Sequence, residues 1–336
     1  MVAVNSLTPR LWVMNADCEA ELAVWPAPYR RIPTIARRNR RLAPELLWLT
    51  RPGDALEVEL PWEPELVSRA SERGVELVPC DARGDSPGRS LEPWGWTPSA
   101  ATVGVMHGAV VDGPPFEVVR RVSSKLFSHA LERELGVGVD GASVTDSMAS
   151  LAGVLRTACP RKDDKWVVKS PFGFAARERV LGRGPAIDDR AGKWAARRFA
   201  NGERLLVEPW HDVIREYGVP IVVHPDGEVE VVGFSDLQTN RAGAAEGYWL
   251  GRPVAPGVAH ELARVATLVG QRLAAEGYAG PAGIDALEHT GGLRPLVEIN
   301  ARWTMGHVAV AVARTLPSGS FFKPGGELTG LQDLQD

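Results

Sequence analysis

The stretch that decides the fold is Pro295-Leu-Val-Glu298-Ile-Asn300-Ala-Arg302, taken together with Asp285 upstream of it. Glu298 and Asn300 stand two residues apart in a β-like run, so their side chains share one face of the predicted strand. A turn at Thr290-Gly291-Gly292 separates this run from the apolar run that leads to Asp285, which predicts a β-hairpin. Paired strands would bring both carboxylates and the amide together, and these hard oxygen ligands suit Mg2+ shared with nucleotide phosphates.

Arg302 continues the same strand face beyond Asn300, where its guanidinium could hold a second anion. Two plainer interpretations stay open at this point. The Glu-x-Asn face could be a polar strand surface turned to solvent, and Arg302 could form a salt bridge with a neighbouring acid. The motifs in the rest of the chain favour the binding site.

Composition bounds the class of protein. The chain has 336 residues, enough for two or three domains or one elaborate one, and its 44% hydrophobic and 24% charged residues are ordinary for a soluble globular protein. A formal net charge of -4 without a long basic block argues against non-specific nucleic-acid binding. The scattered cysteines Cys18, Cys80 and Cys159 predict neither a zinc site nor a disulfide framework. We expect a cytoplasmic protein with no signal peptide, no membrane partner and no nucleic-acid partner.

The first part of the chain reads as a small parallel α/β unit. Strand candidates lie at 10–14, 46–49 and 75–78, and a helix is predicted over 63–73, with Pro64 in its first turn and Gly74 as its stop.

Helices and strands alternate irregularly in the remainder of the chain. Helices are predicted over 118–135, 147–157, 188–199 and 257–277, and strands over 165–169, 204–208, 217–223 and 228–234. A polar, glycine-bearing loop is predicted over 170–184. The expected domains are an N-terminal α/β domain at 1–110, a first lobe with the glycine loop at 111–200, a second lobe with the metal site at 201–317, and a loosely ordered tail at 318–336.

The motifs follow a specific order: a helix lysine, a lysine that closes a strand, a glycine loop, a Glu-Pro segment, a hairpin, a long helix, then Asp and Glu-x-Asn. Over residues 121–307 this order resembles the ATP-grasp superfamily, which includes D-alanine–D-alanine ligase, biotin carboxylase and many amino-acid ligases. The resemblance implies an α/β and α+β ATP-grasp fold with a small N-terminal α/β (pre-ATP-grasp) domain.

The resemblance also implies roles for residues of the first lobe. Lys125, in Val122-Ser-Ser-Lys125, would reach the nucleotide phosphates, and Lys169, at the end of Trp166-Val-Val-Lys169, would neutralise the α- and β-phosphates. Gly173 belongs to the loop expected to close over the triphosphate. Phe174, Glu178 and Arg179 depart from the family's usual glycine loop, and Arg177 or Arg179 would supply charge there.

In the second lobe, Glu208-Pro-Trp210-His211 looks like the interdomain segment whose glutamate and following backbone contact the adenine edge. Glu216 loosely matches the residue that accepts from the ribose hydroxyls. The metal ligands would be Asp285, Glu298 and Asn300, and an arginine in the place of Arg302 would hold a substrate carboxylate or an acyl-phosphate oxygen. Two further candidates are weaker. Arg241 could hold a carboxylate, and His307 either touches substrate or is structural.

The function that this resemblance implies is an ATP-dependent carboxylate–amine ligase that works through an acyl phosphate, with ATP and Mg2+ as cofactors and Arg302 and Lys169 as catalytic residues. Its partners would be a small carboxylate and a small amine, amino-acid-like or peptide, and a homodimer is common in the family. Two alternatives remain: a phosphotransferase on the same scaffold, and a nucleotide-binding regulatory protein without turnover.

Overall fold

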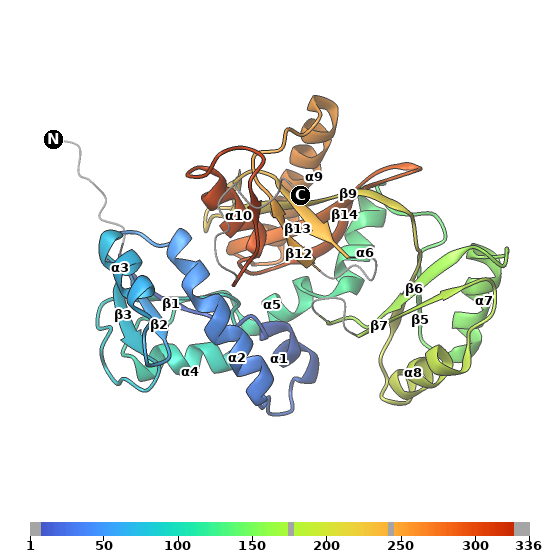
Figure 1. The fold of residues 1–336 in the computed structure, drawn as a ribbon. Helices are drawn as coiled ribbons and strands as arrows, with labels where there is room; N and C mark the ends of the chain where they lie inside the picture. Colours follow the sequence, from blue (N-terminus) through green and yellow to red (C-terminus); the bar gives the residue numbers. More distant parts are fainter. Residues whose placement is uncertain (1–7, 174–177, 241–244, 326–336) are drawn as a thin grey trace.

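The computed structural model describes residues 8–173, 178–240 and 245–325, which build three sheets (Figure 1). The N-terminal sheet is parallel, with the strand order β3-β2-β1-β4. Its strands are β1 (Arg10–Val13), β2 (Ala55–Val58), β3 (Glu76–Pro79) and β4 (Ser90–Pro93). Around it lie the helices α1 (Cys18–Val24), α2 (Pro33–Leu42), α3 (Pro64–Glu72) and α4 (Pro98–Met106).

The strand predicted at 46–49 is wrong, because this segment belongs to the 3-10 helix η1 (Ala43–Trp48). Leu46 and Leu47 are adjacent and both fully buried. In a strand that covers a core on one side, successive side chains point to opposite faces, so only one of the two would be buried there. A short apolar run does not distinguish a strand from a buried helical turn. The strand of this region is β2, which sequence reasoning missed.

The second sheet is antiparallel, with the order β5-β8-β6-β7, and packs on two helices. Its elements are β5 (Ser143–Thr145), α7 (Met148–Ala158), β6 (Lys165–Lys169), β7 (Arg179–Arg183), α8 (Asp189–Ala200) and β8 (Leu205–Pro209). The fully buried Trp166 is the largest side chain of its core. Since β8 pairs with β5 and β6, a boundary at 200/201 does not separate this sheet from the next one.

The third sheet carries the predicted hairpin and has the order β14-β13-β9-β11-β12-β15, with β10 paired to β9. Its strands are β9 (Val213–Val223), β10 (Val229–Val231), β11 (Ser235–Thr239), β12 (Ala245–Trp249), β13 (Gly280–His289), β14 (Gly292–Asn300) and β15 (Phe321–Phe322). The long helix α9 (Pro256–Ala275) buries its apolar side on this sheet, and α10 (Met305–Ala313) follows the hairpin.

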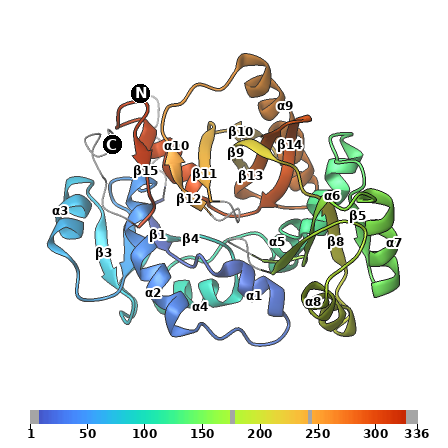
Figure 2. The same ribbon diagram turned by 45° about the vertical axis from the view of Figure 1, so that its right-hand side comes forward.

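The helix predicted over 118–135 is two helices, α5 (Phe116–Val122) and α6 (Lys125–Glu134). Ser123 is the C-cap of the first helix, and Ser124 is the N-cap of the second, where its side chain accepts a hydrogen bond from the backbone N–H of Leu126 at 3.2 Å. Both helices pack on the core of the third sheet; in Figure 1 and Figure 2, α5 lies below this sheet and α6 lies beside it, on the side of the second sheet. The break makes Lys125 the first residue of α6 and aims it at the hairpin.

The expected loose tail at 318–336 is only partly within the described residues. In the described portion Phe321 and Phe322 pair with β12, and Phe322 is buried, so this segment is anchored and the expectation is wrong there. Within the described ranges no helix combines the length and apolar character that crossing a membrane needs.

Gly182 on β7 gives a test of how tightly the second sheet is packed. A Cβ added there would lie 2.0 Å from the Trp166 ring, whereas one added at Gly153 on α7 would meet nothing within 4 Å. We expect Gly182→Ala to lower the free energy of unfolding by ~1–3 kcal/mol through overpacking. Gly153→Ala, in a helix interior, should raise it by roughly 0.5–1 kcal/mol. Urea titrations of both variants, followed by tryptophan fluorescence, would refute the packing if Gly182→Ala were as stable as Gly153→Ala.

Candidate active site

A cavity of about 350 Å3 lies where the second and third sheets meet, and the N-terminal domain closes one end of it. Ten of the site residues singled out in the sequence line this one cavity: Lys125, Lys169, Gly173, Glu208, Trp210, Glu216, Asp285, Glu298, Asn300 and Arg302. Segments far apart in the chain thus converge at one place.

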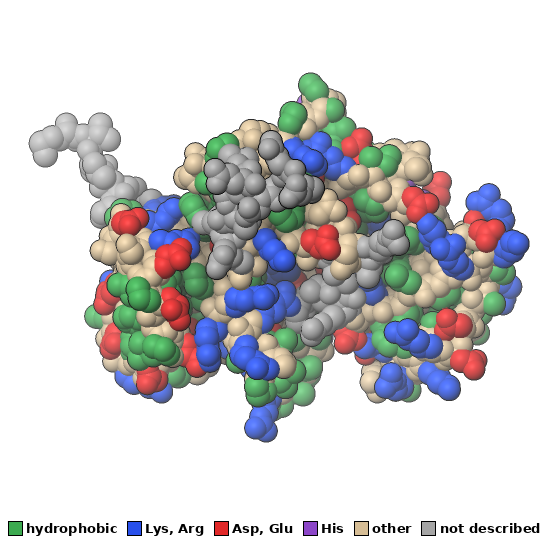
Figure 3. Space-filling view, in the orientation of Figure 1, with side chains coloured by type: hydrophobic (Ala, Val, Ile, Leu, Met, Phe, Trp, Pro, Cys, Tyr) green, Lys and Arg blue, Asp and Glu red, His purple; other side chains and the backbone are tan. Residues whose placement is uncertain are grey.

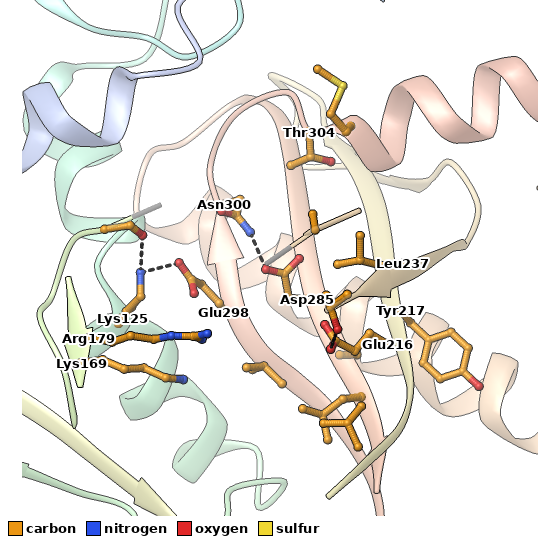
Figure 4. Close-up of a pocket in the computed structure, with 18 of the residues that line it drawn as sticks. Lys125, Lys169, Arg179, Glu216, Tyr217, Leu237, Asp285, Glu298, Asn300 and Thr304 are labelled. Carbon is orange, nitrogen blue, oxygen red and sulfur yellow. Dashed lines mark hydrogen bonds and ion pairs between the residues drawn. The ribbon is translucent and has the colours of Figure 1, made fainter. Parts of the chain in front are cut away.

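The acid pair at the centre of the cavity comes from the β13–β14 hairpin, where Asp285 and Glu298 are direct cross-strand partners (Figure 4). Asn300 donates from Nδ2 to Oδ2 of Asp285 at 3.1 Å. Burial and, after it, the negative charge of Glu298 raise the pKa of Asp285 to about 7. Two facing carboxylates of this kind favour a bound cation.

This donor set fits Mg2+, which is commonly held by one or two carboxylates and completes its octahedron with water and substrate phosphates. No described group of three or more His, Cys, Asp or Glu side chains could hold a metal ion by itself. Among the described residues, the carboxylates of Asp285 and Glu298 and the amide of Asn300 supply a donor set of this kind at the cavity.

Lys125 faces the same acids from the start of α6. Its Nζ lies 2.6 Å from Oε1 of Glu298 and donates to the carbonyl oxygen of Gly173 at 2.9 Å. Burial opposes its charge, but the carboxylates of Glu298 and Glu19 outweigh burial and raise the pKa of Lys125. The lysine thus links the acid pair to the beginning of the glycine loop.

Lys169 belongs to a second, buried cluster of charges. Its ammonium pairs with the carboxylate of Glu208, which also pairs with Arg294, and Arg294 reaches Glu132 on α6 with Nε 2.5 Å from Oε1. Burial alone would raise the pKa of Glu208, but the charges of Lys169 and Arg294 outweigh it and lower that pKa to about 2. Glu208 and Glu132 are each only 1% exposed, so both depend on these cations.

The cluster changes the role expected for Glu208. Its carboxylate is taken up by Lys169 and Arg294 and is not directed to an adenine edge as the resemblance implied. Pro209 has no N–H, and the N–H of Trp210 donates to the carbonyl oxygen of Lys165 at 2.8 Å. Because Pro209 has no N–H and that of Trp210 is already bonded, the next backbone N–H of this segment is that of His211.

Arg179, at the start of β7, lines the cavity and places its guanidinium carbon 5.1 Å from the centre of the Trp210 ring. Glu216 accepts a hydrogen bond from Oγ1 of Thr239 at 2.6 Å. The remaining residues of the glycine loop and the carboxylate-binding candidate lie outside the described residues: Phe174, Arg177 and Arg241.

The contacts of Arg302 bear on both interpretations left open by the sequence, an anion-binding residue of the site and a salt bridge to a neighbouring acid. Its Nε and Nη2 donate to Oε1 of Glu19 at 2.8 and 2.6 Å, and Nη2 also donates to Oδ1 of Asn300 at 2.9 Å. The salt bridge to a neighbouring acid is therefore present, and it lies on the cavity wall beside the acid pair. Sequence reasoning missed Glu19, since nothing in the sequence of α1 points to a residue so distant in the chain.

His307 is structural. It forms a capping box with Thr304 at the start of α10, and its Nε2 lies 3.2 Å from the carbonyl oxygen of Ile221. Burial lowers the pKa of His307 to about 4, so the ring is neutral near pH 7.

Arg294 supplies the test of the buried cluster, because its removal leaves two buried carboxylates with less compensation. We expect Arg294→Met to lower the free energy of unfolding by about 3–5 kcal/mol. Arg264→Met removes an exposed pair with Glu261 on α9 and should leave the unfolding midpoint almost unchanged. Equal midpoints for the two variants in thermal unfolding would show that the cluster contributes no stability.

Neither a protein-family model nor a curated protein matches the sequence, but solved structures match its fold. Pyruvate carboxylase from Rhizobium etli has a TM-score of 0.59 and 15% identity, over 93% of this chain and 28% of that one. The biotin carboxylase domain of Hydrogenobacter thermophilus 2-oxoglutarate carboxylase, crystallised with MgADP and bicarbonate, has 0.55 and 13%, over 92% and 70%. N5-carboxyaminoimidazole synthetase from Staphylococcus aureus has 0.52 and 10%, over 95% and 80%. These are ATP-grasp enzymes, and the likeness establishes architecture: the chain has the ATP-grasp fold.

Proposed function

We propose that this protein is an ATP-dependent carboxylate–amine ligase that works through an acyl phosphate. The observation that carries the proposal is one cavity lined both by two lysines, Lys125 and Lys169, and by the cross-strand pair of Asp285 and Glu298. Phosphoryl transfer needs concentrated positive charge around the phosphates and exclusion of water, and it needs no protein nucleophile.

The nucleotide would lie along the cavity between the second and third sheets. Lys125 and Lys169 now pair with Glu298 and Glu208, and each could exchange part of that contact for phosphate oxygens. Mg2+, held by Asp285, Glu298 and Asn300, would supply further neutralisation of the phosphate charge. MgADP is bound in the Hydrogenobacter thermophilus neighbour, which supports ATP and Mg2+ as cofactors here.

The reaction has two steps. A substrate carboxylate oxygen attacks the γ-phosphorus, and ADP leaves. The substrate amine then attacks the acyl carbon, loses a proton, and phosphate leaves. Arg302 would orient the carboxylate or the acyl-phosphate oxygens, and its fork, now shared between Glu19 and Asn300, is already held at the acid pair.

The experiment that tests the proposal is ADP release with Mg2+, screened over pairs of small carboxylates and amines, amino acids and short peptides among them. A ligase releases ADP only when both substrates are present and yields an amide. Stable phosphoester formation from a single hydroxyl substrate would show a phosphotransferase. ATP binding without turnover over the whole panel would show a regulatory protein. A homodimer and a cytoplasmic location remain predictions.

Glu298 and Asn300 allow a graded test of the metal site. Glu298→Gln removes a negative charge that would attract Mg2+. We expect kcat/KM to fall by about a hundredfold or more, equivalent to ~2.7 kcal/mol. Asn300→Ala removes a neutral ligand, so its loss should be smaller, about tenfold. Kinetics at limiting Mg2+ would test this, and full activity of Glu298→Gln would remove the metal assignment.

Lys169 and Lys165, at the two ends of β6, form a matched pair. Lys169 lines the cavity, whereas Lys165 pairs with Asp212 outside it. We expect Lys169→Ala to raise the KM for ATP and to lower kcat, while Lys165→Ala changes neither by more than about twofold. The reverse order in steady-state kinetics would contradict the proposed place of the nucleotide.

A further inference from the structure

A second, larger cleft of about 1240 Å3 adjoins the active-site cavity. Three parts of the chain form its walls: the segment between α1 and α2, the helices α5 and α6, and the lobe of the second sheet. Glu19 and Gly173 line both hollows. Because Gly173 accepts from Lys125, which also contacts Glu298, the cleft opens onto the acid pair where the reaction is proposed to occur.

The charges in the cleft do not balance. Its acids Glu178 and Glu203 both pair with Arg198, and Glu19 pairs with Arg302. The cation Arg121 pairs with Glu276.

Within the described part of the chain, the remaining cations form no ion pair: Arg30, Arg120 and Arg204. Arg120 donates only to the carbonyl oxygen of Leu22 and lies over the ring of Phe172, 5.2 Å from its centre. Opposite these three cations stands one acid without a cationic partner, Glu117, which accepts from Trp25. The cleft therefore has an excess of positive charge.

The excess is carried by opposing walls. Arg30 belongs to the N-terminal domain just before α2, and Arg204 stands just before β8 in the lobe of the second sheet. Figure 3 also shows basic side chains over the place where Figure 1 draws α2, although the arginines of that helix do not line the cleft. An anion between the two walls would be attracted from both sides. Arg30 and Arg204 are both exposed, so they attract it without a large desolvation cost.

We propose that this cleft, defined by Arg30, Arg120 and Arg204, binds the amine substrate through an anionic group, a carboxylate or a phosphate, remote from the reacting amine. The proposal rests on the ligase function proposed above, because the cleft leads to that site. The volume of the cleft, more than three times that of the cavity beside it, suits an extended acceptor such as an acidic peptide better than a single small amino acid.

The test is calorimetric titration of the full chain loaded with Mg2+ and a non-hydrolysable ATP analogue. The probes are triglutamate, its neutral counterpart triglutamine, and phosphoethanolamine. We expect an anionic probe to bind at least about tenfold more tightly than triglutamine, and to lose most of that advantage at 0.5 M salt, where the Debye length is only about 4 Å. Tighter binding of triglutamate would identify a carboxylate, and tighter binding of phosphoethanolamine a phosphate.

Variants assign the effect to the cleft. The double variant Arg30→Gln/Arg204→Gln should lower the affinity for the anionic probe about five- to tenfold, since each exposed contact contributes modestly. Arg30→Lys/Arg204→Lys keeps the charge and should retain most of the affinity. Arg37→Gln, an exposed position on α2 that does not line the cleft, is the matched control and should change nothing.

Equal binding of triglutamate and triglutamine, failure of both anionic probes to bind, or unchanged affinity in the Gln double variant would overturn the proposal. Nucleotide affinity is measured first in the same experiment. If the ATP analogue binds and the anionic probes do not, the cleft proposal fails while the ligase function stands. If the ATP analogue itself does not bind with Mg2+, the ligase function fails.

Discussion

The pairing of β13 with β14 places the Asp285 carboxylate directly opposite that of Glu298, and the rest of the site is arranged around this repulsion. Like charges in such positions normally destabilise a sheet. Here Lys125 contacts Glu298, Asn300 donates to Asp285, and Arg302 holds Asn300 from the other side. Among the described residues, the sheet thus keeps two acids facing each other beside one lysine and a neutral amide, an arrangement that a divalent cation would complete.

A second group of charges connects the lobes behind this pair. Lys169 comes from the second sheet, Arg294 from the third, and Glu132 from α6, and all meet at or beside Glu208 at the end of β8. Such buried ions are costly to separate, because removing one leaves another uncompensated. The cluster therefore fixes the lysine proposed to reach the phosphates relative to the strand that carries the acids. Because Lys169 and Arg294 both pair with the Glu208 carboxylate, that carboxylate is not free to contact the adenine of a nucleotide.

Local sequence signals predicted the hairpin, the approach of Asp285 and Glu298 across it, and the lysine at the end of β6, because strand alternation and turn residues are read within a few positions of the chain. They did not predict Arg294 or Glu19, whose partners lie far away in the sequence and meet them only after the lobes pack. The sequence predicts a strand at 46–49 because a short run of apolar residues has no periodicity that distinguishes a strand from a buried helical turn. Arg294 had one available signal: it shares strand β14 with Glu298 and stands between the apolar residues Leu293 and Pro295.

The most direct test of the account is a crystal structure of the protein with Mg2+ and a non-hydrolysable ATP analogue. The account predicts the metal between Asp285, Glu298 and Asn300, the phosphates within hydrogen-bonding distance of Lys125 and Lys169, and the adenine beside the segment after Pro209. A nucleotide bound elsewhere, or bound in this cavity with its metal away from the acid pair, would contradict it.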